Sequence, residues 1–384
     1  MNSRSLSQLH VLKNDWWLLA CITVVPVLVA AMIWAIFSTN IARDLPFGVV
    51  TNDNTQLSRM LIRELDATST LKVTDYFSSP DEAKVAMRNN AIYGFVVIPN
   101  EFSKDVYKGQ QPQVSVFYNS QYILVGRLIS GATSTVIGTF NAQVGTIRAL
   151  SEGNSTTSSA LGRSVTIQNQ ITPLFNKNTN YNQFLVGAAV PTIWQILIVV
   201  STILALAANH RIYGLNTMLK SGVLRSVTNI CSFYLPFFLI QGVLYVTIFY
   251  YGLNWPNNGS IVAILFAQLV TVVACMVMGS FFFFLTLDAA RAMSFAGAFT
   301  APSFAFLGVT FPVSDMGSAA QIWRSLLPAS HYIEAQIAQS SYGVTSWQTI
   351  EGLVPMMWYL VPFLLVSLLG KKHLSKAQMA MEGK

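Results

Sequence analysis

Hydrophobic and polar positions are distributed very unevenly along this chain of 384 residues. One apolar segment lies near the start, a long stretch of mixed sequence follows at residues 39–184, and the remainder is mostly apolar. A helix rises about 1.5 Å per residue and a bilayer core is roughly 30 Å thick, so each apolar segment is long enough to cross it. The pattern predicts six transmembrane helices, at residues 17–38, 186–208, 228–252, 261–287, 294–312 and 353–370.

Two segments could change this count of six transmembrane helices. The fifth predicted span carries Gly297, Pro302 and Gly308, which membrane helices tolerate when neighbours satisfy the freed backbone groups. Residues 122–150 contain no acidic residue and could form a further span, but Arg127 and Arg148 lie within them. We expect an α-helical integral membrane protein with six transmembrane helices and a domain inserted between the first two.

Within the insert, the hydrophobic period alternates between that of a strand and that of a helix, as in mixed α/β domains. Asp53 or Asn54 can cap the first helix, and Ser79 with Glu82 forms a capping box at the second. From residue 121 onward the period is helical, which predicts a long external helix. Strands are expected at residues 46–51, 71–77, 91–98 and 113–118, with helices between them.

Basic residues predict the orientation, because short cytoplasmic segments are rich in Lys and Arg. In the six-span arrangement only Arg324 falls on one side outside the insert. This places both termini in the cytoplasm and the insert in the periplasm or its equivalent. The other side holds Arg4, Lys13, Arg211, Lys220, Arg225, Arg291, Lys371, Lys372, Lys376 and Lys384.

Composition agrees with a membrane protein, since 53% of the residues are hydrophobic and only 10% are charged, against roughly 25% charged in soluble chains. The net charge of +7 follows from the asymmetry of the basic residues, so binding to nucleic acid is not needed to explain it. All three cysteines lie in predicted spans, so the insert has no disulfide framework.

Catalytic and metal-binding patterns are missing from the sequence. The four histidines are scattered and lack metal-ligand spacing. Residues 214–221 superficially resemble a phosphate-binding loop, but Leu219 stands where the second glycine is required. We expect no catalytic, cofactor or metal site on this chain, and therefore no enzyme.

Three sequence stretches in this order resemble the permease subunits of bacterial ABC-2 type exporters, in the branch with a large external domain between the first two spans. They are FGVVTNDNTQLSRMLIREL at 47–65, AIYGFVVIPNEFSKDVYKG at 91–109 and FLGVTFPVSDMGSAAQIWRSLLPASHYIEA at 306–335. The resemblance covers nearly the whole chain. The loop HRIYGLNTMLKSGVLRS at 210–226 departs from it, because it has neither the acidic residue nor the proline that often occur in the family.

The resemblance implies that a separate cytoplasmic ABC ATPase, which binds ATP and Mg²⁺, drives export of a lipophilic or amphiphilic small molecule, drug or lipid. It also implies a second permease copy or paralogue, contact with membrane lipids, a periplasmic adaptor protein as a further partner, and a place in the bacterial inner membrane. The ATPase would dock on the amphipathic segment at residues 1–16 and on a cytoplasmic coupling loop at residues 209–227, and residues 371–384 would be a cytoplasmic tail. The coupling residues would be Arg211, Tyr213, Gly214, Leu219 and Lys220.

The implied external element spans residues 313–352 as re-entrant or short helices, and its marker residues are Phe311, Pro312, Pro328 and Tyr332. Uncharged polar groups within spans face a cavity or another helix. Gln195, Gln241 and Gln268 therefore either line a cargo path or form hydrogen bonds between helices. A different functional class also fits the sequence, namely a membrane-anchored surface receptor or docking protein that uses the external domain.

Overall fold

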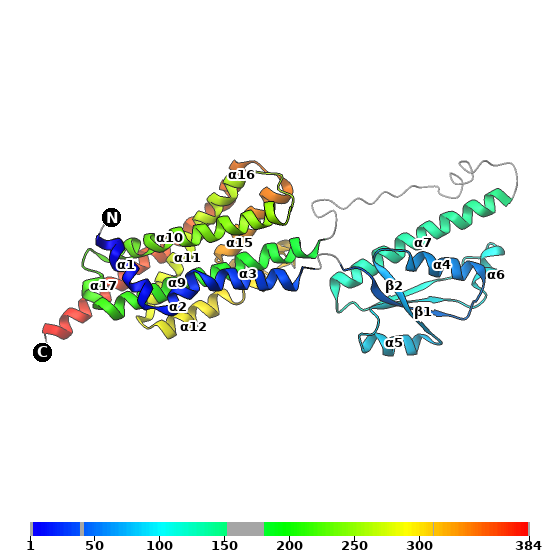
Figure 1. The fold of residues 1–384 in the computed structure, drawn as a ribbon, viewed down its shortest axis with the longest axis horizontal. Helices are drawn as coiled ribbons and strands as arrows, with labels where there is room; N and C mark the ends of the chain where they lie inside the picture. The colour runs from blue at the N-terminus through cyan, green and yellow to red at the C-terminus, as the bar shows by residue number, and fades with distance from the viewer. Residues whose placement is uncertain (1–2, 39–41, 152–179, 310, 383–384) are drawn as a thin grey trace. The chain divides into compact units, whose positions relative to one another are not determined.

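The computed structural model describes residues 3–38, 42–151, 180–309 and 311–382. The chain divides into two units, which we describe separately: one comprises Met1–Asn40 with Pro173–Lys384, and the other is Ile41–Thr172 (Figure 1). The first is a bundle of helices. The second contains a small sheet with helices on both faces.

The sheet of the second unit has the strand order β2-β1-β3-β4. Strand β1 pairs in parallel with β2 and β3, and β4 is an antiparallel edge strand. The strands are where the alternation of apolar residues predicts them, although β3 and β4 are shorter than expected. Their bounds are β1 Leu45–Thr51, β2 Leu71–Phe77, β3 Gly94–Ile98 and β4 Ser115–Tyr118.

Both faces of this sheet are buried, as is usual for parallel strands. Phe47 and Val49 of β1 point into a core shared with α4 (Gln56–Asp66) and α7 (Ile123–Ser151). Val50 points the other way, towards α5 (Pro80–Arg88). Figure 1 shows α4 and α7 on one side of the sheet and α5 on the other. One half of the predicted capping box is present, because Ser79 accepts a hydrogen bond from the Glu82 amide, whereas the Glu82 carboxylate accepts the amide of Ser78 and not that of Ser79.

The helical unit is organised around α9 and α11, which pack against each other, while α3, α10, α12, α15 and α17 pack on them. Its long apolar helices are α9 Tyr181–Met218, α10 Val223–Thr247, α11 Ile261–Thr286 and α17 Leu360–Glu382. The shorter helices at its N-terminal end are α1 Ser3–Asn14, α2 Trp16–Ile22 and α3 Val24–Ile36. Between α11 and α17 lie α12 Ala289–Thr300, α13 Ser303–Phe306, α14 Ser318–Ser325, α15 Pro328–Ile337, α16 Ser346–Leu353 and the 3-10 helix η4 Val354–Tyr359.

The count of six spans is not reproduced in the described residues. Four helical segments there are long and apolar enough to cross a membrane, and α2 with α3 makes a fifth if this pair, bent by 45°, counts as one span. The fifth predicted span, residues 294–312, is wrong as a single helix. Helix α12 ends at Thr300, because Pro302 cannot donate a hydrogen bond to the preceding turn.

Several predicted loops are helical instead. Helix α9 extends to Met218 with a break at Gly214, so most of the expected loop at 209–227 is helical and belongs to α9 and α10. Helix α17 continues to Glu382 through the expected cytoplasmic tail. The external element at 313–352 contains short helices. Which side of a membrane each part faces stays a prediction.

Candidate functional site: polar ties between the membrane helices

A buried network of uncharged polar side chains connects the helices of the first unit. Its centre is Trp194 on α9, which is 1% exposed and donates its indole N–H to Gln241 Oε1 on α10 at 3.0 Å. Gln241 in turn donates to the carbonyl of Ile22 at the end of α2. The Trp194 ring also contacts the rings of Tyr245 and Tyr332 edge to face. The network therefore joins four helices, α2, α9, α10 and α15, around one indole.

Gln268 on α11 extends the network towards α15. Its amide nitrogen donates to the hydroxyl of Tyr332 at 2.9 Å and to the carbonyl of Gly242 at 3.1 Å. The close approach requires glycine, because a Cβ at position 242 would lie 2.5 Å from Gln268 Oε1. Gln268 thus fixes α10, α11 and α15 together.

Gln195 makes a third tie, between α9 and the chain after α12. It donates to Ser303 Oγ at 3.2 Å and accepts a hydrogen bond from the Ala329 amide at 2.6 Å. Ala329 is in the first turn of α15, whose unpaired amides need such an acceptor. Pro328 is the first residue of this helix and is buried. The other two marker residues before it, Phe311 and Pro312, are exposed.

All three glutamines are at most 5% exposed, and each is bonded to another helix or to an interhelical segment. Of the two interpretations of the sequence, these contacts favour hydrogen bonds between helices. A role in a cargo path stays a prediction. The sequence analysis did not identify Trp194, Tyr245 or Ser303 as members of this network. A tryptophan directly before a glutamine within an apolar span, as in Trp194 and Gln195, is a signal that could have pointed to the centre of the network.

A second set of polar contacts attaches α1 to the end of α9. Gln8 and Asn209 exchange two side-chain hydrogen bonds, of 2.8 and 3.1 Å, and both residues are buried. Val11 and Leu12 are buried beside them. We call this pair the Gln8–Asn209 clamp. The two amides satisfy each other's hydrogen bonds away from water, and they join α1 to α9.

Asp15 strengthens the same junction. One carboxylate oxygen accepts a hydrogen bond from the Leu18 amide and so caps α2. The other accepts a hydrogen bond from Arg211 Nη2 of α9 at 2.9 Å. The Arg211 side chain is 68% exposed, so this ion pair contributes only about 0–1 kcal/mol. Its geometry nevertheless orients the exposed end of α9.

The predicted coupling residues differ in accessibility. Gly214 interrupts α9 with φ of 70°, a conformation that glycine adopts readily. Lys220 is exposed and Tyr213 is half-buried, whereas Leu219 is only 2% exposed and packs in the core. Leu219 therefore has a packing role. Ile212, which the sequence did not single out, is 40% exposed beside them.

The sheet unit has a polar cavity of about 840 Å³ at the carboxyl ends of β1 and β2, lined partly by Arg59, Arg63 and Tyr76. Such edges often bind ligands. In this structure the backbone amides beside the cavity are bonded to Asp53. Its carboxylate accepts hydrogen bonds from the amides of Thr55 at 3.1 Å and Ser103 at 2.9 Å. Asp53 thereby ties α4 to α6 (Phe102–Tyr107).

Burial by itself raises the pKa of the Asp53 carboxyl, but the hydrogen bonds from Ser103 and Thr55 outweigh it. The pKa is therefore lowered below its ordinary value. Among the residues that the structure describes, no group of His, Cys, Asp or Glu is arranged to hold a metal ion.

Apolar helices of membrane-spanning length, tied together by buried uncharged side chains, are the features of a multi-pass membrane protein. The family model described as ABC-2 family transporter protein matches residues 16–369, and the chain belongs to this family. It is thus a membrane transport subunit and not itself a catalytic enzyme, and the family implies a partner ATPase subunit. The comparisons with curated proteins and with solved structures found no match.

Proposed function

We propose that this chain is the permease subunit of an ATP-driven exporter that moves lipophilic or amphiphilic small molecules, drugs or lipids outward. A separate cytoplasmic ATPase hydrolyses the ATP. The observation that carries the proposal is the Gln8–Asn209 clamp, because it joins α1 to the end of α9. A partner that binds to one of these two helices is therefore linked to the other.

The proposed docking surface consists of the exposed residues Arg211, Ile212 and Lys220 at this junction. The excess of basic residues favours a cytoplasmic position for it. A partner that binds there contacts the same helix that carries Trp194 and Gln195 farther along. Its movements would therefore reach α10, α11 and α15 through the buried network.

The apolar character of the spans supports a lipophilic or amphiphilic cargo. In the described part of the four long spans, no buried Asp, Glu, Lys or Arg is present, and proton-coupled carriers normally need such groups. Export into the periplasm, the inner membrane as location, a second permease copy and an adaptor belong to the same proposal and follow from the resemblance.

The test is copurification of the tagged chain with its ATPase in mild detergent. The double variant Ile212→Asp/Lys220→Glu should reduce the bound ATPase by about tenfold or more, because losing a central interface residue typically costs about 2 kcal/mol. Lys376→Glu, an exposed charge change on α17, is the matched control and should retain the ATPase. A stable wild-type chain that never retains an ATPase would contradict the proposal and favour the receptor interpretation.

A further inference from the structure

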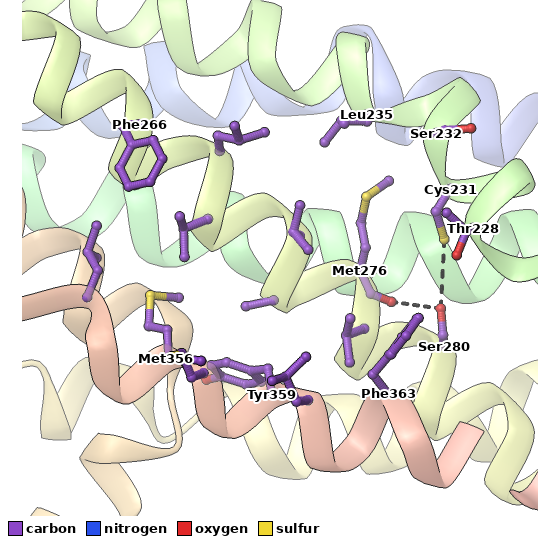
Figure 2. A pocket seen from close by; sticks show the side chains of 18 of the residues that line it. Thr228, Cys231, Ser232, Leu235, Phe266, Met276, Ser280, Met356, Tyr359 and Phe363 are labelled. Atoms are coloured by element: carbon purple, nitrogen blue, oxygen red, sulfur yellow. Dashed lines mark hydrogen bonds between the residues drawn. The ribbon is translucent and has the colours of Figure 1, made fainter. Parts of the chain in front are cut away.

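An apolar groove of about 710 Å³ lies between α10, α11 and the segment formed by η4 and α17 (Figure 2). Leu235, Phe266 and Met356 are among its walls, and Tyr359 and Phe363 close one side. We call it the α10–α17 groove. Its polar groups are few, and Figure 2 shows Thr228, Ser232 and Ser280 gathered at one end.

The groove is open along one side. Phe266, Val273 and Met357 line it and are 43%, 46% and 64% exposed. These residues belong to segments that are long and apolar enough to cross a membrane, so the opening faces hydrocarbon. Apolar walls favour a hydrocarbon chain over water as the occupant.

Helices α10 and α17 meet beyond the hydroxyl-bearing end. A Cβ at Gly370 would lie 2.5 Å from Cγ1 of Val223, so the two backbones approach closely there. Arg225 lies two residues after Val223, and Lys371 directly follows Gly370. The contact therefore places two cationic residues at the same level, beyond the end of the groove where the hydroxyl groups gather.

Helical spacing directs both cations towards the groove. Arg225, Thr228 and Ser232 follow each other at intervals of three and four residues, so they share one face of α10. Lys371 comes eleven residues after the groove residue Leu360, about three helical turns, and so lies on the same side of α17. Both cations are exposed, and within the described residues neither has a carboxylate in ion-pair contact.

We propose that the α10–α17 groove binds one acyl chain of an anionic phospholipid, whose phosphate lies against Arg225 and Lys371. The apolar walls recognise the chain and the two cations recognise the headgroup charge. This site is independent of the proposed cargo, and it would bind lipid whether or not an ATPase is attached.

The experiment is native mass spectrometry of the full chain, incubated with an equimolar mixture of phosphatidylglycerol and phosphatidylcholine. Wild type should retain phosphatidylglycerol preferentially. In Arg225→Gln/Lys371→Gln this preference should fall by roughly 30-fold, since each basic residue near an anionic surface contributes on the order of 1 kcal/mol. Lys376→Gln is the matched control, because it removes a charge of the same helix, 16 residues after Leu360 and on the opposite face, and it should retain the preference.

Val273→Trp should fill the groove and remove binding of both lipids, with an unchanged size-exclusion profile as the test of folding. The proposal is overturned if wild type shows no preference for the anionic lipid, or if the double variant retains the same preference as Lys376→Gln. It is also overturned if Val273→Trp splits a dimer while lipid retention is unchanged, because a second copy of the chain would then cover the groove.

Discussion

At the scale of single residues, partners far apart in the sequence determine what each buried polar side chain does. Gln195 bonds to Ser303 and Ala329, and Gln268 bonds to Tyr332. The sequence identified these glutamines as unusual, because polar groups in apolar spans need partners. It could not identify the partners, since these depend on how the helices pack. Asp53 is a similar case: it was predicted as a possible cap of the first helix, but the N-cap of α4 is Thr55, and Asp53 instead accepts hydrogen bonds from the amides of Thr55 and of Ser103 in α6.

Asp53 provides a prediction of pH dependence. Its pKa is lowered in the folded protein, so its stabilisation is fully present above the unfolded-state value of about 3.9 and is lost as the pH falls through the lowered folded value. Asp53→Asn should destabilise the sheet unit at neutral pH by about 1–3 kcal/mol, because Asn lacks the second acceptor oxygen. The difference from wild type should shrink below about pH 4.

Scanning calorimetry of the full chain in detergent between acidic and neutral pH measures this difference. Asp81→Asn is the control, because Asp81 is exposed and only pairs with Lys84 at the surface. That change should be nearly neutral. An Asp53→Asn effect of the same size at every pH would contradict the assignment.

At the scale of elements, local signals were sufficient for the sheet unit. The strand at 71–77 and the helix capped by Ser79 form as predicted, because capping and alternation act between neighbours in the sequence. The fifth span failed because hydropathy does not register a backbone break at Pro302. The loop predicted at 209–227 is mostly helical, with a break at Gly214, and its first residue, Asn209, bonds to Gln8 of α1, a contact that the sequence pattern does not reveal.

The Gln8–Asn209 clamp gives a prediction at this scale. Asn209→Leu leaves the buried amide nitrogen of Gln8 without its acceptor, which costs about 1–3 kcal/mol. Hydrogen exchange of the α1 amides should become about tenfold faster, because 1.4 kcal/mol corresponds to a tenfold change. Ser201→Ala on the same helix is the control, since the Ser201 hydroxyl is buried without a hydrogen-bond partner. Equal exchange in Asn209→Leu and Ser201→Ala would show that the clamp does not hold α1.

At the scale of the whole molecule, the chain combines a helical unit of an ABC-2 transporter with a separate sheet unit. Family membership gives the transport class, whereas cargo, direction and sidedness rest on charge distribution, apolar spans and resemblance. The proposed docking surface for the ATPase lies at the exposed end of α9 and the turn after it, where Arg211, Ile212 and Lys220 are exposed.

The most direct test is ATP-dependent uptake by proteoliposomes that contain the chain with its copurified ATPase. ATP added outside energises only complexes whose ATPase faces outward, so an exporter moves cargo into the vesicles. We predict ATP-dependent accumulation of an amphiphilic probe from a small panel, which should be lost in Ile212→Asp/Lys220→Glu and retained in Lys376→Glu. Vesicles that hydrolyse ATP at the same rate with and without the chain, and accumulate no probe, would contradict it.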